Sequence, residues 1–192
     1  MFNRGPEARV EGIGVLSAEL ERQADIYRGL GVQKDAIMRL LTPRPDRLPK
    51  ELSIPVVTLG VSVDLNLQAR FAGITPYFDL SRAYDTAGGI TDAQPRLIWM
   101  HDGEKNKGKS VEWVRDHLKG NTRPSTLADG IALAITQPNI KSILRNHAIH
   151  LSGSAVGSDS APGLGVWDGD LELVHLFGDF ANPFWGSALS GS

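Results

Sequence analysis

Residues 164–176 read Leu-Gly-Val-Trp-Asp-Gly-Asp-Leu-Glu-Leu-Val-His-Leu, and this stretch decides the fold class. Asp168-Gly169 is a strong signal for a two-residue hairpin turn. The segments on either side, Leu164–Trp167 and Leu171–Leu176, are therefore predicted to be paired antiparallel strands. Because a hairpin so late in the chain does not fit a sheet of parallel strands, the sequence favours an α+β fold.

The segments before the hairpin supply further helices and strands. Thr126-Leu-Ala-Asp129 resembles a capping box, and we expect the helix that it opens to end before Pro138. Pro138 is itself suited to open another helical turn. Additional strands are predicted near 54–59, 95–100 and 147–152, and residues 87–92 are predicted to be a loop.

Residues 61–71 are ambiguous. Alternating apolar and polar residues have the period of a strand, whereas the Leu65/Ala69 and Leu67/Phe71 pairs have helical spacing. The residues leave both structures open, and Ser62 is a candidate cap if the segment is a helix.

The N-terminal part is predicted to be helical. Residues 1–13 are expected to form a flexible tail, and residues 14–42 a helical hairpin with helices near 17–30 and 33–41. A proline-rich linker, 43–50, leads into the sheet-containing body, 51–192. The whole prediction is a single α+β domain (14–192). It has a mixed sheet of about five strands flanked by helices.

Composition excludes several classes of protein. The chain has 192 residues, a formal net charge of −2 and no cysteine. This charge balance gives no electrostatic case for nucleic acid or an anionic membrane, and the lack of cysteine excludes disulfides and thiolate chemistry. No apolar run approaches the length of a membrane helix, and the N-terminus lacks a signal-peptide pattern. We therefore expect a cytoplasmic protein.

Residues 103–110, Gly-Glu-Lys-Asn-Lys-Gly-Lys-Ser, match the phosphate-loop pattern of nucleotide-binding proteins. In that interpretation Gly103, Gly108, Lys109 and Ser110 would hold the phosphates of ATP or GTP with Mg²⁺. The partner carboxylate for Mg²⁺ is missing, however, because Asp168 is better explained by the hairpin. The opposing interpretation is an exposed turn in which Ser110 caps a helix and Trp113 packs inward.

The histidines and serines raise two further hypotheses, a metal site and a serine hydrolase. His147 and His150 are three apart, so on a strand they point to opposite faces and cannot share a metal. Serines near residues 152–160, with His150 or His175 as base, would be needed for a serine hydrolase, but nothing identifies a triad. We therefore assign no catalytic residue, no metal site and no cofactor in the favoured interpretation.

Aromatic residues are concentrated in the second half of the chain. One interpretation is a filled core, and the other is a partner-binding patch formed by Trp167, Phe180, Phe184 and Trp185. Because two large rings at 184 and 185 lie near a chain end, at least one is expected to pack into the body, with Gly191 and Ser192 left loose.

Four stretches resemble an actinobacterial-type bacterial domain family of unknown function. They are Glu21–Gly31, with its Arg-Gln and Leu-Gly pairs, the segment from Leu127 to Pro138 followed by His147–Ser154, and the closing Phe184–Ala188. The resemblance implies a helix at 61–71 and no phosphate loop at 103–110, and it brings no activity with it. This chain departs from the family pattern after Ala188, where Leu189 and Ser190 stand instead of a cysteine-containing end.

These observations predict a bacterial cytoplasmic protein that works by binding a protein partner or itself, with no catalysis. The alternative is a nucleotide-binding or nucleotide-hydrolysing protein that uses Gly103–Ser110.

Overall fold

The computed structural model describes residues 6–40, 53–86 and 94–191. The proline-rich linker predicted at 43–50 and the loop predicted at 87–92 lie outside these ranges, as do residues 1–5 of the predicted tail.

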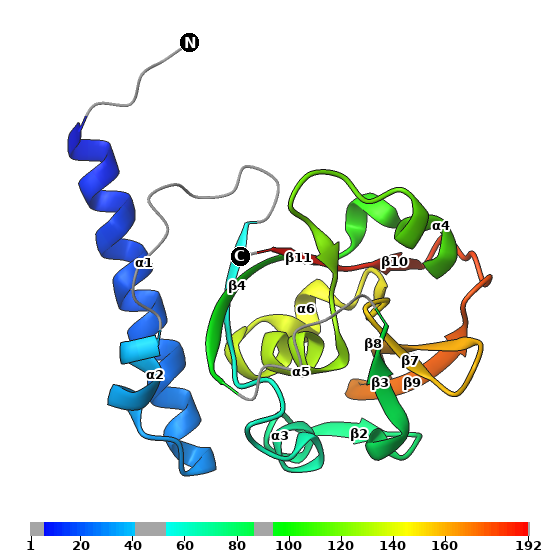
Figure 1. The fold of residues 1–192 in the computed structure, drawn as a ribbon, viewed down its shortest axis with the longest axis horizontal. Helices are drawn as coiled ribbons and strands as arrows, with labels where there is room; N and C mark the ends of the chain where they lie inside the picture. Colours follow the sequence, from blue (N-terminus) through cyan, green and yellow to red (C-terminus); the bar gives the residue numbers. More distant parts are fainter. Residues whose placement is uncertain (1–5, 41–52, 87–93, 192) are drawn as a thin grey trace.

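A long helix opens the described part of the chain. α1 (Pro6–Ile26) continues into a 3₁₀ turn, η1 (Tyr27–Leu30), and α2 (Lys34–Leu40) packs back against α1 (Figure 1). Gly31 has a φ of 77°, which allows the reversal between them. The helical hairpin is thus as predicted, but α1 begins at Pro6, inside the segment predicted as a tail. Proline is well suited to the first position of a helix, and the prediction overlooked this signal.

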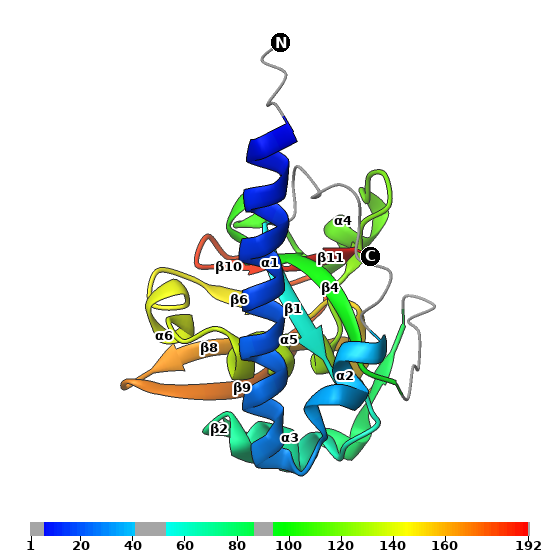
Figure 2. The same ribbon diagram turned by 90° about the vertical axis from the view of Figure 1, so that its left-hand side faces the viewer.

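The hairpin docks through one stripe of α1. Leu16, Leu20, Ala24 and Tyr27 are buried and follow the helical repeat. They pack with Val57, Leu59 and Trp99 on a sheet that includes β1 (Ile54–Thr58), which α1 crosses in Figure 2.

Polar side chains of α1 also complete the outer edge of β1. The Gln23 amide donates to the Pro55 carbonyl at 2.8 Å and accepts from the Val57 N–H at 2.7 Å. The Tyr27 hydroxyl donates to the Val57 carbonyl at 2.6 Å. Gln23 therefore takes the place that a neighbouring strand would occupy, and α1 covers an edge that would otherwise be open to pairing.

The first sheet has four antiparallel strands in the order β1-β4-β11-β5. Its other members are β4 (Arg96–His101), β5 (Arg123–Pro124) and β11 (Leu189–Gly191). The last described residues thus form an interior strand, with Gly191 opposite Trp99. The prediction that Gly191 is loose is wrong, because its backbone is held by β4.

The second sheet has seven strands and is mixed. Its main path runs β10-β6-β8-β7-β3, and β9 pairs with both β8 and β2. The β10–β6 and β2–β9 pairs are parallel and the others are antiparallel. Its strands are β2 (Ile74–Pro76), β3 (Ala83–Asp85), β6 (Ala148–His150), β7 (Ser154–Val156), β8 (Ser160–Trp167), β9 (Asp170–Phe177) and β10 (Trp185–Ser187).

The hairpin that decided the fold class is present as predicted. β8 and β9 pair from Ser160↔Phe177 to Trp167↔Asp170. Asp168 and Gly169 have φ values of 51° and 89°, so both central residues of the turn adopt a left-handed backbone conformation. The structure differs from the prediction in the number of sheets. The strands form two sheets, whereas a single sheet of about five strands was predicted. Strands of two or three residues carry too little periodicity to be read from sequence.

Helices fill the space around the two sheets. The helix predicted from the capping box is α5 (Leu127–Thr136), and it ends before Pro138 as expected. Its side chains pack with Met100 of the first sheet and Leu164 of the second, so both sheets share one core. The ambiguous segment is helical, as α3 (Leu65–Phe71), but its cap is Asp64 and not Ser62, whose hydroxyl donates to the Leu59 carbonyl. Short helices complete the fold: η2 (Leu80–Arg82), η3 (Glu104–Asn106), α4 (Val111–Asp116) and α6 (Ile140–Ile143).

The architecture is therefore a single α+β domain, because β10 and β11 carry one continuous stretch of chain from the second sheet into the first. Within the described ranges, no helix has the length and apolar character needed to cross a membrane.

Candidate functional site

The phosphate-loop-like segment lies between β4 and α4, as the sequence predicted. Gly103 and Gly108 have φ values of 86° and 76°. Ser110 caps α4, with its hydroxyl accepting from the Trp113 N–H at 3.1 Å. The Ser110 hydroxyl is thus directed to its own helix.

Six of the eight backbone N–H groups of this segment donate hydrogen bonds within the protein. A phosphate loop needs several free N–H groups that converge on one point. Here Gly103 donates to the His101 ring, and Glu104 donates to the Asp102 carboxylate. Four further N–H groups donate to backbone carbonyls, namely those of Asn106, Lys107, Gly108 and Lys109. The geometry therefore gives no support to nucleotide binding by Gly103–Ser110.

The segment instead covers the edge of the second sheet. The Gly108 N–H donates to the carbonyl of Trp185 on β10, and the Asn106 amide donates to that of Ser187 at 2.8 Å. A Cβ placed on Gly186 would lie 2.1 Å from the Gly103 carbonyl oxygen. A Cβ on Gly103 would in turn collide with the Gly186 carbonyl group, so this close backbone contact requires the glycine at position 103 of the motif without any ligand.

Trp113 is not packed inward, contrary to the prediction. Its ring is stacked on His117 at a centroid distance of 4.1 Å, and the Lys109 ammonium lies 4.7 Å from the ring centroid. The inward positions of α4 are taken by Val111 and Val114, which are buried. Trp113 therefore lies on the outer face of a short helix, with Lys109 and His117 over its ring.

The four predicted partner-binding residues divide into two pairs. Trp185 is buried on β10 and its ring lies 5.7 Å from that of half-buried Trp167. A Cβ on Gly163 would collide with the Trp185 ring, so this ring packs directly against the backbone of β8. Phe180 and Phe184 are exposed. The expectation that one of the rings at 184 and 185 packs into the body is confirmed by Trp185.

Exposed aromatic residues gather where the β9–β10 connection meets α4. The exposed fractions are 68% for Phe177, 38% for Phe180, 40% for Phe184 and 40% for Trp113. We call these four residues the aromatic rim. Phe177 and Trp113 were not among the predicted residues. The alternation of β9 would instead have placed Phe177 inward, on the same face as Leu171 and Leu173, so the strand pattern could not have identified its exposure.

Backbone contacts fix the two halves of the rim together. The Phe180 N–H donates to the Phe177 carbonyl, which forms a tight turn. The Glu112 N–H, next to Trp113, donates to the Gly178 carbonyl at 3.2 Å. The Phe184 N–H donates to the Asn182 side chain at 2.8 Å. Phe177, Phe180 and Trp113 are thus held together through Gly178, and the segment of Phe184 is held to the start of α4 by the Gly108 N–H, which donates to the Trp185 carbonyl.

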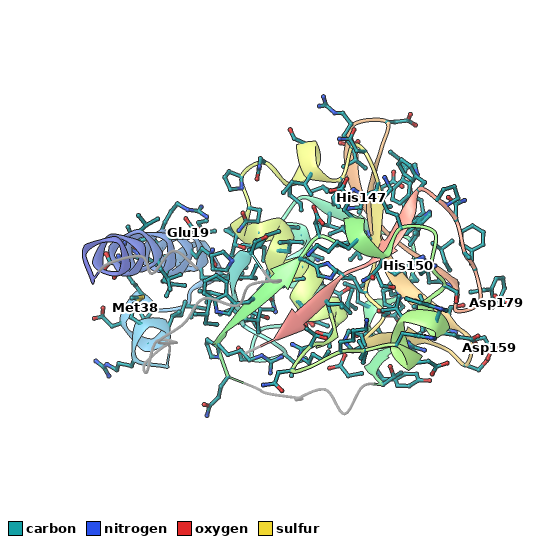
Figure 3. The ribbon with its side chains drawn as sticks, turned by 90° about the horizontal axis from the view of Figure 1, so that it is seen from above. Glu19, Met38, His147, His150, Asp159 and Asp179 are labelled. Carbon is teal, nitrogen blue, oxygen red and sulfur yellow. The ribbon has the colours of Figure 1, made fainter. Side chains whose placement is uncertain are left out.

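The three histidines considered for metal or hydrolase chemistry each contact a different group. His147 contacts the Asp102 carbonyl through Nε2, and exposed His175 lies edge-on to the Phe78 ring. His150 is fully buried beside Trp185, and neither of its ring nitrogens has a hydrogen-bond partner (Figure 3). Burial lowers the pKa of His150 to about 4, so the ring is neutral. Across the described residues, no cluster of three potential metal ligands is found.

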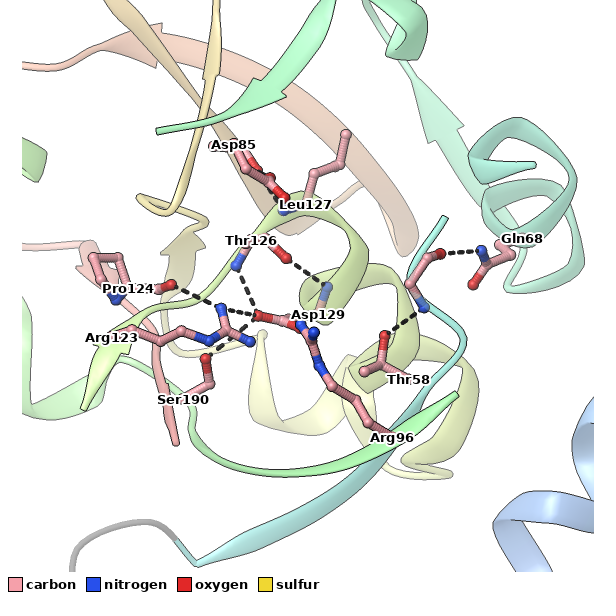
Figure 4. A network of polar contacts seen from close by, with 12 residues as sticks. Thr58, Gln68, Asp85, Arg96, Arg123, Pro124, Thr126, Leu127, Asp129 and Ser190 are labelled. Carbon is pink, nitrogen blue, oxygen red and sulfur yellow. Dashed lines mark hydrogen bonds and ion pairs between the residues drawn. The ribbon is translucent and has the colours of Figure 1, made fainter. Parts of the chain in front are cut away.

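A buried polar network lies at the start of α5 (Figure 4). The fully buried Asp129 carboxylate accepts from the Thr126 N–H, from the Ser190 hydroxyl and, at 2.7 Å, from the Arg123 guanidinium. Arg96 approaches Asp129 at 3.8 Å from β4. The predicted capping box is therefore confirmed, and its Asp129 also ties α5 to the four-stranded sheet.

Asp85 lies beside this network. Its carboxylate accepts from the Ser154 hydroxyl at 2.7 Å, and that hydroxyl accepts from the Leu127 N–H. Burial raises the pKa of Asp85, and the charge of Asp129 acts in the same direction. The hydrogen bonds join α5 to β3 and β7, which gives the network a structural role.

Comparison of the chain with protein-family models, with curated proteins and with solved structures found no match. Function is therefore argued from the geometry.

Proposed function

We propose that the protein works by binding a protein surface, either that of a partner or that of a second copy, without catalysis, and that the aromatic rim is the contact. The observation that carries this proposal is the exposure of four large aromatic side chains on one backbone-fixed surface. Aromatic side chains are enriched at protein interfaces, because they bury a large area with few rotatable bonds. Exposed apolar patches of this kind commonly mark interaction sites.

Peptide display selection against the full chain tests this proposal. Selected peptides should bind the Phe177→Ser/Phe180→Ser variant at least about tenfold more weakly, because aromatic anchors dominate binding energy. Tyr77→Ser is the matched control, since Tyr77 is 64% exposed elsewhere on the surface. Sedimentation of both variants and of the parent chain reports self-association in parallel. Equal binding by the rim variant would refute the proposal, as would a selection without binders from a chain that stays monomeric.

We also propose a bacterial, cytoplasmic setting. The absence of cysteine fits a reducing compartment, and the family resemblance is to bacterial sequences. Fractionation of bacterial cells that express the full chain tests the location, and recovery in the membrane or extracellular fraction would contradict it.

A further inference from the structure

Three carboxylates surround the aromatic rim. The Glu112 and Asp159 backbones are joined through Gly178, whose carbonyl accepts from the Glu112 N–H and whose N–H donates to the Asp159 carbonyl at 2.7 Å. A Cβ at Gly178 would lie 3.8 Å from the Glu112 carboxylate oxygen. Asp179 is the next residue, and it lies with Asp159 at the end of the molecule remote from Glu19 and Met38 (Figure 3).

These carboxylates are exposed and have no salt-bridge partner among residues 6–40, 53–86 and 94–191. Lys109 lies over the ring of Trp113, at one side of the rim. The Arg115 guanidinium donates to the backbone carbonyls of Ser152 and Ser154. Glu112 interacts electrostatically with Arg115. Among the described residues, the rim therefore combines apolar rings with two carboxylates, those of Asp159 and Asp179, that have no ion-pair partner.

We infer that the aromatic rim binds a basic segment of a partner protein, in which arginine or lysine side chains alternate with apolar ones. This inference rests on the proposed binding function and adds the chemistry of the partner. Arginine fits both features, because its guanidinium stacks on aromatic rings and pairs with carboxylates through two parallel hydrogen bonds. The contact that Lys109 already makes with Trp113 shows the same chemistry within the chain. Apolar side chains of the segment would cover Phe177 and Phe180, while its cations face Glu112, Asp159 and Asp179.

Fluorescence anisotropy with a labelled peptide of alternating leucine and arginine tests the inference on the full chain. Peptides in which glutamine or glutamate replaces arginine are the probes for charge. The informative variant is Asp159→Asn/Asp179→Asn, which keeps the aromatic rings. Its matched control is Asp168→Asn/Asp170→Asn, which makes the same charge change at the opposite end of the β8–β9 hairpin. Asparagine tolerates the left-handed conformation of residue 168.

The arginine peptide should bind more tightly than the glutamine and glutamate peptides. Asp159→Asn/Asp179→Asn should weaken its binding about fivefold, as expected for the loss of two exposed ion pairs, and the control should leave binding unchanged. Raising the salt concentration should remove the difference between parent and variant.

Two results separate failure of this inference from failure of the proposed function. If the glutamine peptide binds as tightly as the arginine peptide, and Phe177→Ser/Phe180→Ser abolishes both, the rim binds partners but not through their charge. If the arginine peptide does not bind, or if both asparagine variants weaken it equally, the basic-partner inference is refuted. The display selection then decides whether the rim binds anything.

Discussion

Replacing Gln23 with methionine should destabilise the protein more than its position on a surface helix suggests. The side chain is fully buried and holds the Pro55 carbonyl and the Val57 N–H on the outer edge of β1. Methionine has a similar length but cannot donate or accept these hydrogen bonds. Each of these two buried backbone groups left without a partner costs about 1–3 kcal/mol, so the free energy of unfolding should fall by about 2–6 kcal/mol. For a domain of this size the midpoint of thermal unfolding should fall by about 4–24 °C.

The assay is urea denaturation followed by circular dichroism and tryptophan fluorescence. Gln33→Met is the matched control, because Gln33 is an exposed glutamine just before α2. Hydrogen exchange at the Val57 amide provides a second reading, since it should accelerate even if only the helical hairpin detaches. Ordinary surface substitutions change the free energy of unfolding by up to about 0.5 kcal/mol. The edge-covering role of Gln23 would be refuted if Gln23→Met unfolds with a free energy within that margin of Gln33→Met and the Val57 amide stays protected from exchange.

Four further predictions follow from the other contacts. Lys109→Ala should change the melting temperature by no more than about 2–4 °C, because an exposed cation–π contact contributes about 0.5–1 kcal/mol, and ATP or GTP with Mg²⁺ should not shift either protein. A nucleotide-dependent rise that Lys109→Ala removes would restore the phosphate-loop interpretation. Gly169→Val should lower the free energy of unfolding by about 1–3 kcal/mol, since φ is 89° there; an unchanged urea midpoint would contradict this. The free energy of unfolding should fall as pH drops from 6.5, the ordinary pKa of histidine, to the lowered pKa of His150 of about 4, because the unfolded state takes up the proton first. His150→Gln should flatten that dependence, and an equally steep curve would show that other groups cause it. Deleting residues 189–192 should lower the melting temperature by removing β11 from between β4 and β5, and calorimetry that shows no change would mean that this strand contributes little.

Local signals in the sequence predicted the local structure well. Asp168-Gly169 gave the hairpin turn and Thr126–Asp129 gave the cap of α5, because each depends on residues within a few positions. The same is true of Ser110, whose capping role could be stated without knowing the rest of the fold.

Features that depend on distant residues could not be predicted in this way. Nothing near Gly103 indicates that Gly186 crosses it, and β5 and β11 are too short to show alternation. Trp113 was expected to pack inward, but the helix places Val111 and Val114 inward, three residues apart. The carboxylates around the rim come from three separate segments, so only the fold brings them together.

The place of β11 has a consequence for the order of folding during synthesis. Its residues are among the last of the 192 to be made, yet they lie between β4 and β5, and β10 just before them completes one end of the other sheet. A nascent chain that lacks them leaves β4 with an unpaired edge and Asp129 without the Ser190 hydroxyl. Neither sheet can be completed before β10 and β11 have been made, so this domain must complete its folding after residue 191 has left the ribosome.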